Sequence, residues 1–320
     1  MTGEEVTVVI PNYNGKQLLK NCIRTLERQT VRDFTLLVID NGSTDGSTEL
    51  SSDILSMEMV CLPENRGFCG AVNIGLAKAA TPYVLLLNND TEAQETFVEE
   101  MLLAIRRHAD ACSCSACMID YRARTRIDNA GDLYTLLGWA VARGKGRPIE
   151  AYQKECRIFS ACGGASIFDM RAVQAVGGLD EAHFAYLEDV DWGYRARVLG
   201  YRSYYAPRAR VYHVGSATTG TRYNDKKVYL AARNSIYVIF KNMPFLQWLI
   251  NLPFLSVGIM VKLAFFVKKG FGGEYARGIK DGLCGLKTLK KAPFRFKNIP
   301  NYCAIEAEMI LNIGRILLHR

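Results

Sequence analysis

The chain has 320 residues, of which 49% are hydrophobic and 22% charged, and its formal net charge is +8. This apolar fraction supplies a real core and excludes a low-complexity or intrinsically disordered chain. Ten cysteines in a chain that begins with polar and acidic residues indicate reduced thiols in a cytoplasmic setting.

Four short apolar runs alternate with helix-like segments over the first 110 residues. We expect strands at residues 6–10, 34–40, 57–62 and 83–87. The segments after Gly15 and after Gly67 carry apolar residues at helical spacing. Strands that alternate with helices predict an α/β fold with a mostly parallel, doubly wound sheet, whose ligands bind at the carboxyl ends of the strands.

The chain turns polar where these strands end. Asn12 and Asn14 follow the first strand, Asp40 ends the second, and residues 88–90 follow the fourth with the sequence Asn-Asn-Asp. An aspartate such as Asp40 can accept the imide N–H of a pyrimidine base. Asp90 can hold a divalent cation against a diphosphate, because hard cations prefer oxygen ligands.

Two common nucleotide-binding signatures are missing from the sequence. No GxGxxG follows the first strand, and no GxxxxGK[ST] occurs anywhere in the chain. A dinucleotide-dependent dehydrogenase and a P-loop phosphotransferase are therefore disfavoured. After Asp90, Thr91 and Gln94 have the spacing of a capping box, which predicts a helix that starts there and carries Phe97, Met101 and Ile105 on one face.

Four motifs occur in a characteristic order along this half: Val-Ile-Pro-Asn-Tyr-Asn at 9–14, Val-Ile-Asp-Asn-Gly-Ser-Thr-Asp at 38–45, Glu-Asn-Arg-Gly-Phe at 64–68 and Leu-Leu-Asn-Asn-Asp at 86–90. Together they resemble the inverting, GT-A-fold glycosyltransferases of family 2. Within that family the sequence is similar to bacterial rhamnosyltransferase-type enzymes of cell-wall and O-antigen assembly. The resemblance extends from residue 6 to about residue 240.

The resemblance implies a nucleotide-sugar site and a metal site. It implies that the donor is contacted by these residues: Pro11, Asn12, Asn14, Asp40, Asn65, Arg66, Gly67, Asn88, Asn89 and Arg233. Asn88-Asn89-Asp90 corresponds to the family's DxD motif, but the first acid is replaced by Asn88. Asp90 must then carry most of the charge that faces Mn²⁺ or Mg²⁺.

The middle of the chain gives two weaker signals. Cys112, Cys114 and Cys117, with His108 nearby, have a spacing that suits either a zinc site or a strand with a buried face. Residues 119–157 are rich in arginine and glycine and predict a loop-rich insertion over the cleft. Its arginines are expected to be solvated, with phosphate contact as the alternative.

A second group of motifs follows on the acceptor side. The resemblance assigns Gly163, Gly164, Ala165 and Trp192 to the acceptor pocket. Glu188 and Asp189 begin a helix and match the family's acidic pair, whose second member is the general base. We therefore expect Asp189 to be the base with Glu188 beside it, although acidic residues in a first helical turn also simply complement the helix dipole.

His213 follows a strand-like segment in the context Val-Tyr-His-Val-Gly-Ser. A single histidine is more often structural, but this context matches the family position that completes the metal site. An imidazole with a carboxylate oxygen suits Mn²⁺ or Mg²⁺. For Arg233, diphosphate contact and an ordinary salt bridge remain alternatives.

The last eighty residues differ from the rest. Residues 241–320 contain 13 lysines and arginines against 4 acidic residues, whereas residues 1–240 contain 27 against 28. The apolar run from Phe245 to Val267 is interrupted by Gln247, Asn251, Pro253 and Lys262. This pattern favours a helix that lies on an anionic membrane, and a helical subdomain or homodimer interface is the alternative.

The sequence thus predicts a metal-dependent inverting glycosyltransferase at the inner face of the cell membrane. We expect three parts: residues 1–118 for the nucleotide sugar, 119–240 for the acceptor and catalysis, and 241–320 for membrane association or dimerisation. The donor expected by resemblance is dTDP-rhamnose, and the acceptor is a lipid-linked or growing polysaccharide; no nucleic-acid partner is expected. The alternatives are a UDP-glucose or UDP-galactose donor, or an inactive assembly subunit.

Overall fold

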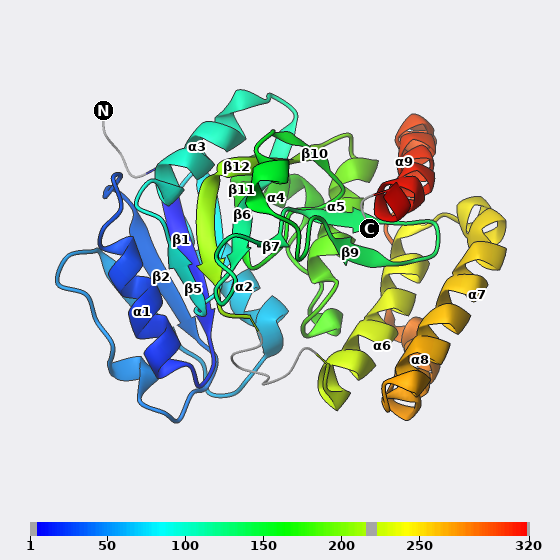
Figure 1. The fold of residues 1–320 in the computed structure, drawn as a ribbon, viewed down its shortest axis with the longest axis horizontal. Helices are drawn as coiled ribbons and strands as arrows, with labels where there is room; N and C mark the ends of the chain where they lie inside the picture. Colours follow the sequence, from blue (N-terminus) through cyan, green and yellow to red (C-terminus); the bar gives the residue numbers. More distant parts are fainter. Residues whose placement is uncertain (1–4, 216–222, 319–320) are drawn as a thin grey trace.

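The computed structural model describes residues 5–215 and 223–318. Among them, ten strands form one mixed sheet whose main path runs in the order β10-β12-β6-β11-β4-β1-β2-β3. Helices cover this sheet on both faces, and the C-terminal helices form a separate layer on the right in Figure 1. The α/β prediction, with a mostly parallel sheet in the first half and helices at the C-terminus, is confirmed.

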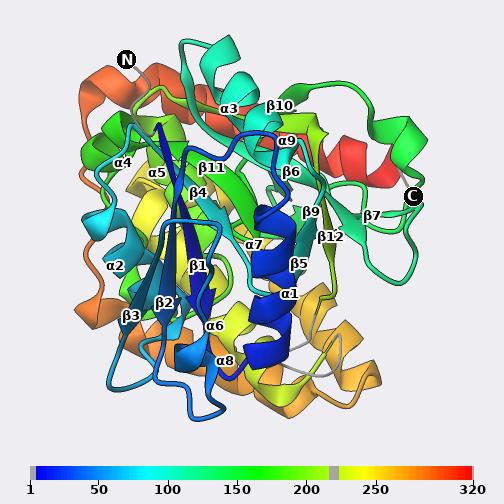
Figure 2. The same ribbon diagram turned by 90° about the vertical axis from the view of Figure 1, so that its left-hand side faces the viewer.

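The first half of the sheet is parallel. It consists of β1 (Val6–Asn12), β2 (Thr35–Asp40), β3 (Met57–Cys61) and β4 (Tyr83–Leu87). α1 (Lys16–Leu26) and α2 (Gly67–Lys78) connect these strands, while the link from β2 to β3 has only the short 3₁₀ turn η1 (Ser47–Glu49). In Figure 2, β1, β2 and β3 lie side by side and α1 crosses in front of the sheet. Their carboxyl ends therefore share one edge.

The segment after Asp90 differs from its prediction. Thr91–Ala93 is a short strand, β5, and the helix α3 (Phe97–Arg107) begins five residues later than expected, after Thr96 in place of Thr91. The capping-box interpretation was wrong because the Thr91 hydroxyl donates to the carbonyl oxygen of Asn88 at 2.7 Å. The expected stripe of Phe97, Met101 and Ile105 is buried, as the sequence predicted.

The second half of the sheet mixes strand directions. β11 (Ala165–Asp169) lies antiparallel between β4 and β6 (Ala111–Asp120), and β12 (Arg202–His213) runs parallel to β6. β7 (Ile127–Asn129) and β10 (Cys156–Ile158) lie at the margins, and β8 (Asp132–Tyr134) pairs with β9 (Ala140–Ala142) in a separate hairpin. α4 (Met170–Val176) and α5 (Glu188–Val198) follow β11.

The three clustered cysteines lie on β6 and do not form a zinc site. Cys112, Cys114 and Cys117 are buried free thiols that pack into three different core clusters. His108 instead stacks on Tyr204 with 3.9 Å between ring centroids. The interpretation of the cysteines as small packing residues is therefore confirmed.

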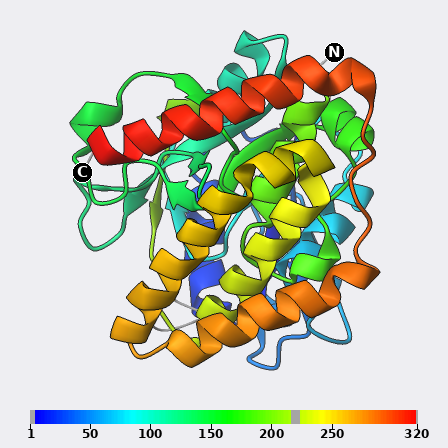
Figure 3. The ribbon, with the colours of Figure 1, turned by 90° about the vertical axis from the view of Figure 1, so that its right-hand side faces the viewer.

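After α6 (Asp225–Asn242), the described part of the last quarter forms the α-helices α7 (Phe245–Lys268), α8 (Gly272–Cys284) and α9 (Ile299–Leu318). Figure 3 shows α7 lying across α6, with α8 and α9 at opposite margins of this face. Residues from α6, α7 and α9 share one hydrophobic cluster with α5 and the β8–β9 hairpin, and its members include Tyr194, Val238, Leu255 and Met309. The C-terminal helices therefore share a hydrophobic core with the preceding residues.

Candidate active site

The carboxyl ends of β1, β2 and β4 bring the expected donor-side residues together. The Asn12 amide donates to Asp40 Oδ1 at 2.9 Å, and its oxygen accepts from the Asn89 amide at 2.7 Å. The second Asp40 oxygen accepts from the backbone N–H of Ser43. Asp40 is 1% exposed, so its carboxylate orders this edge; contact with a nucleobase stays a prediction.

A second set of contacts holds the segment that the resemblance assigned to the nucleotide. The Asn41 side chain accepts from the backbone N–H of Arg66 and donates to Asn65 and to the carbonyl of Gly67. Gly67 has a φ of +76°, and a Cβ there would lie 2.5 Å from the carbonyl oxygen of Phe184. Only glycine fits this close approach, which packs the donor-side segment against the loop before α5.

Asp90 and His213 meet although 123 residues separate them. β5 pairs with β12, so the end of β4 lies against the end of β12. His213 Nε2 lies 3.3 Å from Asp90 Oδ1, and His213 Nδ1 lies 2.8 Å from Asp128 Oδ2. Asp128 is held in turn by Lys145 at 2.6 Å.

This arrangement fits a divalent cation. Asp128 fixes the imidazole through Nδ1, which leaves Nε2 facing Asp90; a carboxylate behind a histidine in this way orients metal-binding imidazoles. One carboxylate and one imidazole are ligands that Mn²⁺ and Mg²⁺ accept, with room for phosphate and water oxygens. Burial lowers the pKa of His213, but Asp128 and Asp90 outweigh it and raise that pKa to about 9. A cation would replace a proton on this imidazole.

The acidic pair lies at the start of α5. Asp189 Oδ2 accepts from the backbone N–H of Gly163 at 3.3 Å, and Asp189 Oδ1 accepts from the N–H of Val190 at 2.8 Å. Burial raises the pKa of Asp189, and these bonds oppose that rise. Burial and the neighbouring Asp189 raise the pKa of Glu188 to about 8. Burial therefore raises the pKa of both carboxyl groups more than the positive end of the helix dipole lowers it. A raised pKa suits a general base.

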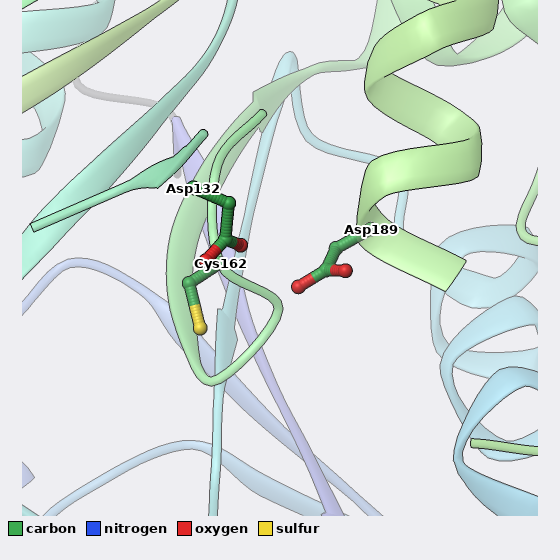
Figure 4. Close-up of side chains that lie close together, drawn as sticks. All are labelled: Asp132, Cys162 and Asp189. Atoms are coloured by element: carbon green, nitrogen blue, oxygen red, sulfur yellow. The ribbon is translucent and has the colours of Figure 1, made fainter. Parts of the chain in front are cut away.

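Asp189 has a neighbour that the sequence did not reveal. Figure 4 shows its carboxylate pointing towards Asp132 and Cys162, and the nearest ligating atoms of the three lie within 4.8 Å of one another. Burial and Asp189 hold the pKa of Asp132 well above its usual range. The pKa of Asp189 is raised as well, so the two carboxyl groups disfavour each other's ionisation, as expected for buried like charges that lie close together.

This cluster is less suited to a metal than Asp90 and His213. Burial holds the pKa of the Cys162 thiol well above its usual value, so the sulfur stays protonated. A metal site would need the thiolate and both carboxylates in their charged forms. The geometry therefore favours a carboxyl pair that shares one proton.

Several predicted roles do not agree with the structure. Trp192 was expected in the acceptor pocket, but it is 2% exposed, packs edge-on against Phe168 and donates to the carbonyl of Gly177. Ala165 is fully buried within β11 and belongs to the main core. Both predictions fail because these side chains fill the space between the sheet and its helices.

Other predicted residues lie close to the expected sites. Gly163 orients Asp189, and Gly164 lies next to Asn88, whose amide would be 3.3 Å from a Cβ at that glycine. Asp191, one turn further into α5, is fully buried and bonded to Arg195, Lys241 and Asn242, so it is a structural residue. Pro11 and Asn14 lie at the donor edge, where Asn14 accepts from the N–H of Thr44.

Arg233 and Asn234 contact the loop that leads to the acidic pair. Arg233 donates to the carbonyls of Ala182 and His183, and no acidic partner is recorded for it among the described residues. The Asn234 amide contacts the carbonyls of His183, Ala185 and Tyr186 at 2.7–3.0 Å. A diphosphate contact by Arg233 stays a prediction.

These features define a class of protein. A GT-A-type sheet carries donor-side polar residues and an aspartate–histidine pair at one edge, and an acidic pair starts the helix α5 beside Gly163. A family model described as "Glycosyl transferase family 2" matches residues 7–177, which is more than half of the chain. The chain belongs to glycosyl transferase family 2.

Individual relatives agree with this assignment. An N-acetylglucosaminyl-diphospho-decaprenol L-rhamnosyltransferase of Mycobacterium tuberculosis is 27% identical over 259 residues, which cover 73% of this chain and 82% of the relative. Other relatives match over a much smaller share of their length, such as 13% of a teichoic acid poly(glycerol phosphate) polymerase from Staphylococcus epidermidis.

Solved structures show the same fold. S. aureus TarS 1–349 in complex with UDP-GlcNAc has a TM-score of 0.58 and 15% identity, and the match covers 95% of this chain and 90% of that one. GalNAc-T7 with UDP, GalNAc and Mn²⁺ has a TM-score of 0.59 and 15% identity, covering 75% of this chain and 48% of that one.

Proposed function

We propose that this glycosyltransferase moves a sugar from a nucleotide diphosphate donor to a hydroxyl of a lipid-linked or growing cell-surface glycan, with inversion at the anomeric carbon. The observation that carries the proposal is the placement of Asp189 beside the sheet edge that holds Asp90 and His213. The same edge thus offers Asp189 as a base for the acceptor hydroxyl, and Asp90 with His213 as a cation site for the leaving diphosphate.

In this reaction Asp189 takes the proton of the acceptor hydroxyl. The hydroxyl oxygen attacks the anomeric carbon, the bond from that carbon to the diphosphate oxygen breaks, and the electron pair leaves with the nucleoside diphosphate. The backbone N–H of Gly163 keeps the Asp189 carboxylate oriented. Asp90 and His213 would hold Mn²⁺ or Mg²⁺, which supplies positive charge next to the leaving diphosphate.

The donor we propose is dTDP-rhamnose, supported by the rhamnosyltransferase of M. tuberculosis, which also makes a lipid-linked acceptor the natural choice. A UDP-linked sugar is the second candidate, because structural neighbours are solved with UDP or UDP-GlcNAc. The sugar transfer would take place at the inner face of the cell membrane. Asn88 weakens the metal motif, yet Asp90, His213 and Asp189 remain together, which supports an active enzyme.

The test is incubation of the purified chain with dTDP-rhamnose, UDP-glucose, UDP-galactose and UDP-GlcNAc in Mn²⁺ or in chelator, with detection of released nucleoside diphosphate. We expect slow, metal-dependent release from one donor. Asp189→Asn should leave donor binding nearly unchanged and reduce turnover to an acceptor by about 10²–10⁴-fold. Full transfer by that variant, or metal-independent transfer by the wild type, would overturn the assignment.

A further inference from the structure

Helix α7 buries the polar residues Gln247 and Asn251 against the protein and exposes many of its apolar residues. The Gln247 and Asn251 amides both donate to Glu306 on α9, at 2.7 and 2.9 Å. The Tyr194 hydroxyl donates to the Gln247 oxygen at 2.9 Å. Two of the four residues that interrupt the apolar run in the sequence, Gln247 and Asn251, are therefore on the buried face of one continuous helix, whereas Pro253 is exposed and Lys262 is half-buried.

The opposite side of α7 is an apolar surface. Its exposed residues include Leu246, Ile250, Val257, Met260 and Val261, each 49–66% exposed. By length and composition alone α7 could cross a membrane, since it has 24 residues and a mean hydropathy of 1.9 over its most apolar window. An apolar groove of about 400 Å³ between α7 and α8 adds to this surface, lined by Ile259, Leu263, Tyr275 and Ile279.

Basic residues lie on the segments next to this surface. Lys268 and Lys269 are exposed at the end of α7, and Lys287, Lys290 and Lys297 are exposed between α8 and α9. Figure 3 shows these segments at the margins of the face that α7 crosses. An apolar centre with a basic margin matches a bilayer with anionic headgroups. A two-fold dimer would place this patch against the same patch of a second copy, so that the basic residues of the two copies would repel each other.

We propose that α7 lies on an anionic phospholipid membrane as a monotopic anchor, with its exposed apolar side in the headgroup and acyl boundary. The hydrogen bonds to Glu306 and Tyr194 keep α7 on the catalytic part, so it does not cross the bilayer. The proposal rests on the proposed function only for the lipid-linked nature of the acceptor.

The anchor also contacts the β8–β9 hairpin, whose first residue is Asp132. The Trp139 indole donates to the carbonyl of Gly258 at 3.1 Å, and a Cβ at Gly258 would lie 2.1 Å from the carbonyl oxygen of Leu137. Leu137 and Trp139 connect β8 to β9, and β8 begins with Asp132 beside Asp189. A membrane under α7 would thus present a lipid-linked acceptor near the proposed base.

The experiment is flotation of the full chain with phosphatidylcholine vesicles, with and without phosphatidylglycerol, at low and high salt. We expect binding that needs the anionic lipid and weakens at high salt. The double variant Ile250→Glu/Val257→Glu should lose flotation, whereas Ile54→Glu/Leu103→Glu, with the same changes at exposed sites over the catalytic sheet, should keep it. Lys287→Gln/Lys290→Gln/Lys297→Gln should bind anionic vesicles roughly 100-fold more weakly, from about 1 kcal/mol per basic residue.

Thermal unfolding and release of nucleoside diphosphate in solution show that each variant is folded, and flotation does not depend on sugar transfer. Flotation of Ile250→Glu/Val257→Glu equal to the wild type would overturn the proposal. The proposal would also be overturned if the wild type formed a dimer and did not bind vesicles, and if only Ile250→Glu/Val257→Glu dissociated that dimer. Wild-type protein that stays in the vesicles at high salt and alkaline pH would show a spanning helix instead.

Discussion

Residues 128–132 supply carboxylates to both sides of the site. Asp128 contacts His213, and Asp132, which accepts from the Asn129 amide at 3.0 Å, lies beside Asp189. This short segment connects the proposed metal side to the proposed base, so substitutions at its two ends should separate metal binding from proton transfer.

Asp128→Asn should weaken Mn²⁺ binding by about 10–100-fold, since a lost carboxylate behind a metal-binding histidine has this effect. Mn²⁺ titration of the purified protein measures it. Lys145→Met removes only the outer ion pair of Asp128 and should change the affinity far less. Equal affinity in Asp128→Asn and wild type would show that His213 is not a ligand.

The sequence predicted Asp90, His213 and Asp189 because each follows a strand or starts a helix in a motif. Asp128 and Asp132 were missed, since they lie in a segment interpreted as a solvated insertion. The sequence Asp128-Asn129-Ala130-Gly131-Asp132 places two carboxylates around turn-forming residues, which could have marked this segment as part of the site. Trp192 and Ala165 were misassigned because a motif position does not show whether a side chain faces a pocket or the core.

At the scale of elements, the loop before α5 is strained. Phe184, Tyr186 and Leu187 have φ values of 62°, 72° and 66°, a region that bulky residues rarely adopt. Such strain persists only when surrounding contacts hold it. The Asn234 amide on α6 contacts three carbonyls of this loop and so fixes the residues that lead to Glu188 and Asp189.

Asn234→Ala should reduce turnover more than donor affinity and lower the free energy of unfolding by about 1–3 kcal/mol, the cost of buried carbonyls without partners. Steady-state kinetics and denaturant unfolding measure the two effects. Asn301→Ala loses a similar bond to the carbonyl of Val198 and should lower stability alone. Unchanged turnover in Asn234→Ala would show that Asn234 does not position the loop that leads to Glu188 and Asp189.

α5 and α6 are joined by a buried ion-pair cluster. Asp191, fully buried, contacts Arg195 at 2.9 Å and Lys241 at 3.0 Å. Burial opposes ionisation of Asp191, but Arg195 and Lys241 outweigh it and lower its pKa. A lowered pKa contributes stability that is complete above the unfolded value, about 3.9, and is lost as pH falls below it.

Asp191→Asn should therefore destabilise the protein at neutral pH by about 3–5 kcal/mol, because it leaves buried cations without their partner. The loss should shrink as the pH falls below about 4, where the unfolded wild-type chain takes up a proton at Asp191 that the folded protein does not. Urea unfolding across pH measures both. A constant difference between the proteins at all pH values would contradict this account.

At the scale of the molecule, the C-terminal quarter packs into a core that it shares with the preceding residues. The sequence placed a boundary at residue 240, yet Leu255, Tyr302, Ile305 and Met309 share a cluster with Tyr134 and Tyr194. The Asn312 amide also donates to the carbonyl of Tyr134 at 2.8 Å. Charge and apolar content led to the prediction that these helices associate with a membrane, but they did not predict the inward-facing packing of the same helices.

A chain cut after Phe240 should accordingly lose part of its core and unfold at a lower temperature than the full chain, even in detergent. Differential scanning fluorimetry and limited proteolysis of both proteins measure the difference. A truncated protein that melts like the full chain would show that residues 241–320 only dock on a complete catalytic part.

The central claim is a single displacement at the anomeric carbon with Asp189 as the base. The most direct measurement is the anomeric configuration of the first product, read by NMR from the transfer reaction with the donor that the chain accepts. The account predicts a configuration opposite to that of the donor, and loss of this product in Asp189→Asn. A product with the donor's own configuration would contradict it.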